Sequence, residues 1–95
     1  MLAKIPIKLE KVKDEKINLE ILRTAIIAEL DAINLYEQMA ELTNDRNLRE
    51  VLLDIAREEK THVGEFQALL LKLDGEQGEE LEKGKREIME LLEKG

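Results

Sequence analysis

The chain has 95 residues, enough for one small domain, and its 22 acidic and 15 basic residues give a net charge of −7. This charge disfavours nucleic acid and anionic membranes as main partners and suits a protein that attracts cations. The sequence has no cysteine, which excludes disulfides and thiolate metal sites, and with no visible secretory signal and no apolar run long enough for a membrane span it predicts a cytoplasmic protein.

The first 17 residues differ in pattern from the rest of the chain. They alternate apolar and charged residues and contain the only proline, Pro6, which predicts an extended arm or a short strand. Five lysines and three acidic residues fall in this segment. One interpretation places it on an acidic surface of its own or a neighbouring subunit, and the other is a loosely ordered terminus. We therefore divide the chain into an arm, residues 1–17, and a helical domain, residues 18–95.

The first predicted helix spans residues 19–42, with Asn18 as its expected N-cap. Residues three or four apart share one face of a helix, and here this face comprises Leu22, Ile26, Glu29, Ile33, Tyr36 and Ala40. A second apolar stripe contains Ile27, Leu30 and Leu35. So wide an apolar surface indicates contact with more than one partner helix.

The second predicted helix spans residues 46–73 and follows the short polar stretch TNDRN, in which Asp45 is the expected N-cap. A connection this short makes the two helices antiparallel. The stretch DGEQG, residues 74–78, then predicts a stop with Gly75 just past the helix end. A shorter third helix is expected over residues 79–92. The predicted fold class is therefore all-α, an antiparallel two-helix hairpin plus a short C-terminal helix.

Ionisable residues interrupt the apolar faces of both long helices. In the first helix the residue is Glu29, and in the second helix Glu59 and His62 lie three residues apart on one face. An unpaired buried carboxylate is costly, and no lysine or arginine stands at a matching position. A bound cation is the simplest explanation, and carboxylates with a neutral imidazole suit iron, manganese or zinc.

The hairpin brings these residues to the same height, because Glu29 lies 15 residues before residue 44 and Glu59 lies 15 after it. One chain then supplies a Glu and a Glu-x-x-His, half of what a carboxylate-bridged di-metal four-helix bundle needs. A two-fold dimer of hairpins completes the set, with Glu29, Glu59 and His62 as metal ligands. Tyr36 lies on the same face two turns after Glu29, where we expect it to hydrogen-bond a ligand carboxylate.

A structural alternative stays open on these residues. An antiparallel helical oligomer without metal can carry polar interface residues that fix its register. Tyr36 and Phe66, the only aromatic residues, then serve as core packing.

The stretches AIIAELDAINLYEQMAE and LLDIAREEKTHVGEFQALLLKLD resemble the rubrerythrin-like ferritin superfamily, and within it the encapsulated ferritins, the ferritin-like cargo of encapsulin nanocompartments. The resemblance covers about residues 18–92. The first ligand glutamate of that family falls on Glu29, its tyrosine on Tyr36, and its Glu-x-x-His on Glu59 and His62.

This resemblance implies a di-iron ferroxidase centre between two subunits of a homo-oligomer, a decameric ring of five dimers. It implies oxidation of Fe(II) by dioxygen, with Fe(III) mineralising inside an encapsulin shell in the cytoplasm. Catalytic roles would fall on Glu29, Glu59, His62 and Tyr36. A rubrerythrin-like peroxide reductase is an alternative, although the cysteine cluster of a rubredoxin-like centre is missing.

The sequence also departs from the pattern of that family. Leu35 stands where some members have a tryptophan before the tyrosine. Of two acidic positions along the route by which iron enters, Asp31 matches one and Ala28 does not match the other. We recognise no C-terminal targeting peptide at MELLEKG. Either a tail has been removed, or the chain is part of a fusion, or it is not a cargo protein.

Overall fold

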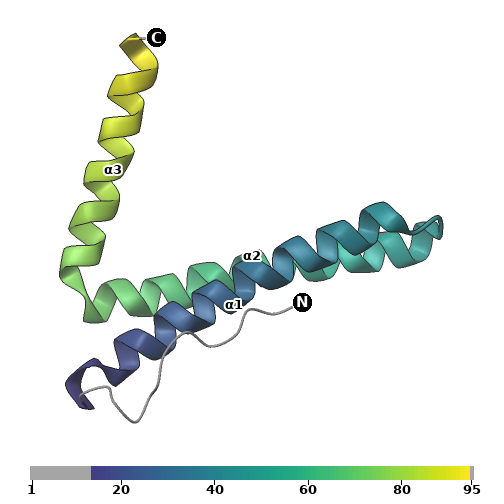
Figure 1. Cartoon of the computed structure of the whole chain (residues 1–95), viewed down its shortest axis with the longest axis horizontal. Coiled ribbons are helices and arrows are strands. Elements are labelled where there is room, and N and C mark those ends of the chain that lie inside the picture. Colours follow the sequence, from purple (N-terminus) through teal and green to yellow (C-terminus); the bar gives the residue numbers. More distant parts are fainter. Residues whose placement is uncertain (1–13, 95) are drawn as a thin grey trace.

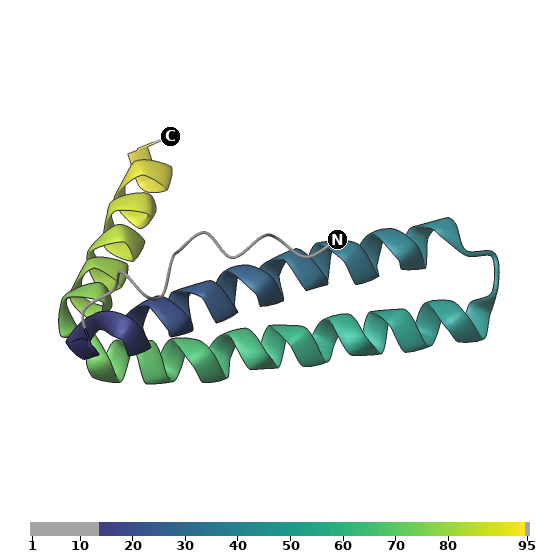
Figure 2. The same ribbon diagram turned by 60° about the horizontal axis from the view of Figure 1, so that its bottom comes forward.

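The computed structural model describes residues 14–94, which form three helices: α1 (Asp14–Leu42), α2 (Arg46–Leu73) and α3 (Gly75–Lys94). Helices α1 and α2 lie side by side as an antiparallel hairpin, and α3 leaves the hairpin at the end away from its turn (Figures 1 and 2). No strand occurs within this range. The all-α prediction of a hairpin with a third helix is therefore confirmed. None of the three helices is long and apolar enough to cross a membrane.

Helix α1 begins earlier than the sequence pattern indicates. It starts at Asp14, so Asn18 is a residue inside the helix and its predicted role as N-cap is wrong. The physical reason is that residues 14–18 contain neither glycine nor proline, so the sequence has no helix breaker there. Residues 1–13, most of the predicted arm, lie outside the described part of the chain.

The turn of the hairpin is fixed by two polar side chains. Asp45 is the N-cap of α2, as predicted, and its Oδ1 accepts the N–H of Leu48 at 2.9 Å. Helix α1 has no basic residue in its last turn. Arg49 of α2 serves this end instead, because its guanidinium donates to the carbonyls of Ala40 and Thr43. These bonds satisfy carbonyl groups that a helix end leaves without partners.

Only Asp74 separates α2 from α3. The predicted break over residues 74–78 and the predicted start of the third helix at residue 79 are therefore wrong. Gly75 does follow the end of α2, but it is already the first residue of α3, and no glycine in the described range has a positive φ. The side chain of Asp74 explains the short junction, because its Oδ1 accepts the N–H of Gln77 at 3.2 Å and so caps α3.

The buried core is small and belongs to the hairpin. It comprises Leu22, Ala32, Ile33, Ala40, Ala56 and Leu70, and α3 contributes no buried residue. Many large apolar side chains of all three helices stay exposed. A chain of this size buries a limited share of its surface by itself. Because the buried residues lie in α1 and α2, the packing of these two helices determines which of their side chains face each other.

Candidate metal centre

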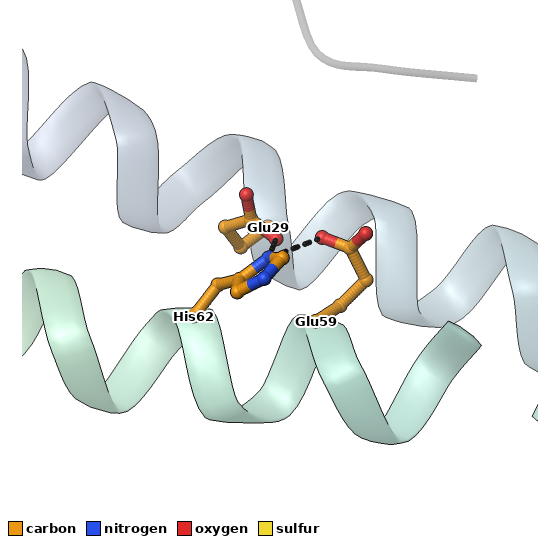
Figure 3. Close-up of side chains that lie close together, drawn as sticks. All are labelled: Glu29, Glu59 and His62. Carbon is orange, nitrogen blue, oxygen red and sulfur yellow. Dashed lines mark hydrogen bonds and ion pairs between the residues drawn. The ribbon is translucent and has the colours of Figure 1, made fainter. Parts of the chain in front are cut away.

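Three ionisable side chains meet near the middle of the hairpin. Glu29 extends from α1, and Glu59 and His62 extend from successive turns of α2 (Figure 3). The Nδ1 of His62 lies 3.4 Å from Oε2 of Glu29 and 3.5 Å from Oε2 of Glu59. One ligand atom from each residue lies within 4.8 Å of the other two. Across residues 14–94 this is the only group of three or more such side chains.

Helix geometry explains why these three side chains lie close together. Residues 59 and 62 are one turn apart, so both side chains stand on one side of α2. The antiparallel partner brings Glu29 opposite them, and the capped turn between residues 42 and 46 keeps the two helices in this register. The structure thus brings together the three residues that the sequence predicts as ligands.

The two carboxylates are shielded from water and share one partner. The exposed fractions of the side chains are 19% for Glu29 and 18% for Glu59, against 44% for His62. Within the described chain their ion pairs are made with His62 alone. Two shielded carboxylates this close repel each other unless a proton or a cation lies between them. The arrangement therefore favours a bound cation.

The spacing of the donor atoms fits a transition metal. Two ligands at about 2.1 Å from one ion, at near-tetrahedral angles, are roughly 3.4 Å apart, which matches the separation of 3.4 to 3.5 Å between His62 Nδ1 and each carboxylate. Two oxygen donors and an imidazole nitrogen suit iron, manganese or zinc. The site is open on the side of His62, where further ligands have access.

Tyr36 lies beside this group rather than in it. It lines a pocket of about 310 Å³ together with Glu29 and Glu59, and the rest of the pocket wall is formed by Ala28, Ala32 and Leu35. In the described structure its hydroxyl makes no hydrogen bond to either carboxylate. The sequence pattern drew attention to Ala28 and Leu35 for other reasons and did not indicate that these residues and Ala32 form a wall beside the ligands, although all three lie within two turns of Glu29.

The acidic residues that flank the motif stay apart from it. Asp31, Glu58 and Glu65 do not belong to the ligand group, and Glu58 and Glu65 are exposed to solvent. For Asp31 and Glu58 this agrees with helix geometry, because residues one or two positions from a ligand point to other sides of the helix. Glu65 lies one turn beyond His62 and is outside the group.

Exposed apolar side chains lie along the side of α2 that carries His62. Leu48, Val51, Leu69 and Leu73 are spaced seven, eleven or fourteen residues from His62, and each is 49–57% exposed. Exposed apolar side chains on one side of a helix, beside a polar cluster, are typical of a surface that another protein surface covers.

Comparisons with known proteins identify the family of the chain. The family model described as rubrerythrin matches residues 20–94. The chain is 68% identical over 73 residues to the "Ferritin-like-encapsulin shell fusion protein" of Pyrococcus furiosus, and this match covers 77% of the chain and 21% of that protein. It is 39% identical over 56 residues to the "Encapsulin nanocompartment cargo protein EncC" of Myxococcus xanthus, covering 59% of the chain and 43% of that protein.

A solved structure matches more of the chain. The crystal structure of the encapsulated ferritin domain from Pyrococcus furiosus has a TM-score of 0.81 and 57% sequence identity, and the match covers 96% of this chain and 93% of that one. The chain spans less than half the length of the two full-length relatives. It belongs to the rubrerythrin family of ferritin-like proteins and, within that family, to the encapsulated ferritins.

Proposed function

We propose that the protein is a ferroxidase, which oxidises Fe(II) to Fe(III) with dioxygen at a di-iron centre shared by two copies of the chain. The observation that carries this proposal is the meeting of Glu29 with Glu59 and His62, whose ligand atoms lie within 4.8 Å of one another. Membership of the rubrerythrin family supports it, since iron-binding bundles of the ferritin-like kind use this set of donors.

Each residue of the site has a defined task in this proposal. Glu29 and Glu59 supply carboxylate oxygens from facing helices, and carboxylates of this kind bridge two metal ions. His62 supplies a nitrogen ligand through the ring atom that faces both carboxylates. When bound, two Fe(II) ions supply two electrons to one dioxygen molecule. Tyr36, at the wall of the adjoining pocket, would orient a ligand carboxylate by a hydrogen bond once ligands are bound.

A second copy of the chain completes the site in this proposal. Three donors are too few for two metal ions, whereas two chains related by a two-fold axis provide four carboxylates and two imidazoles. The half-exposed imidazole of His62 and the exposed apolar side chains along the same side of α2 support this arrangement, because a second hairpin seated there covers both. The result would be a four-helix bundle in which both chains contribute ligands to the metal site.

We further propose that the dimers assemble into a ring of five and act inside an encapsulin shell, where Fe(III) mineralises. This part rests on similarity, since relatives of the chain are described as an encapsulin shell fusion and as an encapsulin cargo protein. Fe(II) and dioxygen are then the substrates, and the shell protein is the partner.

The test is the rate of aerobic Fe(II) oxidation by the purified protein. We expect Glu59→Ala and His62→Ala to lower this rate at least tenfold, because each removes one donor from both metal positions. Glu58→Ala is the matched control, since it removes a neighbouring exposed carboxylate that is not in the group. Equal rates for wild type, Glu59→Ala and His62→Ala would rule the site out. Faster turnover of peroxide than of dioxygen would assign the site to a peroxide reductase.

A further inference from the structure

The bend between α2 and α3 is made by the backbone of a single residue. Asp74 has φ −129° and ψ 87°, whereas an α-helix has about −63° and −42°. Its N–H still donates to the carbonyl of Leu70 at 2.8 Å, so the hydrogen-bond ladder of α2 extends to Asp74 itself. Because α3 begins at the next residue, a change of dihedral angles at this one position turns the bent junction into a continuous helix.

The carboxylate of Asp74 connects three helices at this point. One oxygen accepts the N–H of Gln77 at 3.2 Å and caps α3. The other oxygen accepts a bond from the guanidinium of Arg23, on α1, at 3.0 Å. The side chain of Asp74 is mostly shielded from solvent and that of Arg23 is about half exposed. One residue thus ends α2, starts α3 and ties the junction to α1.

Within residues 14–94 little else restrains the direction of α3. All its residues from Glu79 to Lys94 are exposed, and only Gln77 and Gly78 in its first turns are half-buried. At this point Gly78 packs next to Leu71 of α2, whose Cδ2 lies 3.9 Å from the position of an added Cβ. Both views show α3 projecting away from the hairpin beyond this point (Figures 1 and 2). The angle between α3 and the hairpin therefore depends on the junction.

We propose that Asp74 and Arg23 form a latch that holds α3 in the bent position, and that opening the latch frees α3 to swing out and to align with α2. In the bent position, one carboxylate oxygen of Asp74 accepts an N–H of the first turn of α3, and the other pairs with Arg23. When these two bonds are lost, the continuous helix becomes the more stable arrangement, because its own backbone carbonyls accept the same N–H groups. The latch decides where the exposed apolar side chains of α3, Leu81, Ile88 and Leu92, are presented. It operates independently of the proposed iron chemistry.

Distance measurement by double electron–electron resonance tests the latch, and the absence of native cysteine makes labelling specific. Spin labels on Glu50→Cys in α2 and Glu90→Cys in α3 occupy exposed positions. The labelled chain is diluted into unlabelled chain so that only distances within one molecule are measured. A continuous helix places these two positions about 60 Å apart, because 40 residues rise by 1.5 Å each.

We expect one narrow distance well below this value in the wild type. Asp74→Ala, which removes both bonds, is expected to shift the distribution toward the continuous-helix distance. Arg23→Gln and Asp74→Asn keep an oxygen that caps Gln77 but remove the ion pair, so both are expected to broaden the distribution. Asp54→Ala is the control: it also removes an aspartate that pairs with an arginine, here the exposed pair with Arg57 inside α2, and is expected to leave the distribution unchanged.

Circular dichroism of each variant confirms that the helices are present before distances are compared. Wild-type distributions in Asp74→Ala would overturn the proposal. A shift in Asp74→Ala with unchanged distributions in Arg23→Gln and Asp74→Asn would overturn the part assigned to Arg23, since capping alone would then hold the angle. The rate of iron oxidation is a separate measurement that reports on the metal site, so the outcome of one experiment does not decide the other.

Discussion

Glu29 and Glu59 place two carboxylates close together, an arrangement that lowers the stability of the folded chain when no cation is bound. Their side chains are less than a fifth exposed, and their ligand oxygens lie within 4.8 Å of each other. Without a cation, this proximity opposes folding, with His62 as the shared partner of both carboxylates. A metal ion converts the repulsion into two coordinate bonds, so the stability of the chain should depend on the metal.

This dependence gives a prediction for Glu59→Gln. In the presence of a chelator, the free energy of unfolding of the variant should equal that of the wild type or exceed it by up to about 1 kcal/mol, because the amide removes one of two close negative charges. With added Zn(II) the wild type should gain stability through binding, and the variant should gain little. The measurement is thermal unfolding at fixed protein concentration with chelator and with metal.

Glu58→Gln is the control for this experiment and should follow the wild type under both conditions, because its carboxylate lies outside the ligand group. A Glu59→Gln protein that is weakened in chelator and still gains the full stabilisation from metal would mean that Glu59 has a structural role.

At the scale of helices, the turn of the hairpin depends on its caps. Asp45→Ala removes the acceptor for the N–H of Leu48 and should lower the free energy of unfolding by about 1 kcal/mol. Arg49→Leu removes the donor to two carbonyls at the end of α1 and should also destabilise the protein. Urea denaturation at equal protein concentration measures both. Arg57→Leu, which removes only an exposed ion pair, should have a much smaller effect.

Helix positions were predictable where local signals and packing agree. The apolar spacing of residues 19–42 and 46–73, with Asp45 between them, indicated the hairpin, and the equal distances of Glu29 and Glu59 from the turn indicated that they meet. Asn18 and Gly75 gave misleading signals, because each residue type favours a helix end but also tolerates a helical conformation. The start of α3 was missed because the capping carboxylate of Asp74 outweighs the two glycines that follow.

Other features could not follow from the pattern of one chain. Helical spacing places Tyr36 on the ligand side of α1 but does not determine its hydroxyl contacts, which depend on the side chains and ligands around it. Likewise, a repeat of apolar residues does not distinguish a buried position from one left for another molecule. Leu22 and Leu69 are both leucines on the faces that carry the ligands, yet Leu22 is 9% exposed and Leu69 is 53% exposed.

For the whole molecule, this difference in exposure leads to the last prediction. If a second hairpin covers the exposed apolar side chains on the side of α2 that carries His62, then Leu69→Lys places a charge in that contact and should prevent two chains from pairing. The ligand residues of each chain remain intact in this variant. We expect it to sediment as a smaller species than wild type and to bind iron much more weakly, because each separate chain offers three donors and the pair offers six.

Gln67→Lys provides the matched control, since it adds the same charge to an exposed position two residues away that points to another side of α2. It should keep both the wild-type size and the wild-type iron binding. Sedimentation velocity and anaerobic titration with Fe(II) measure the two quantities on the same samples. If Leu69→Lys exists as single chains and still binds iron at the wild-type ratio and affinity, the site is complete within one chain. The proposal requires that pairing of the chains and iron binding be lost together, so in that case the exposed apolar residues have another role.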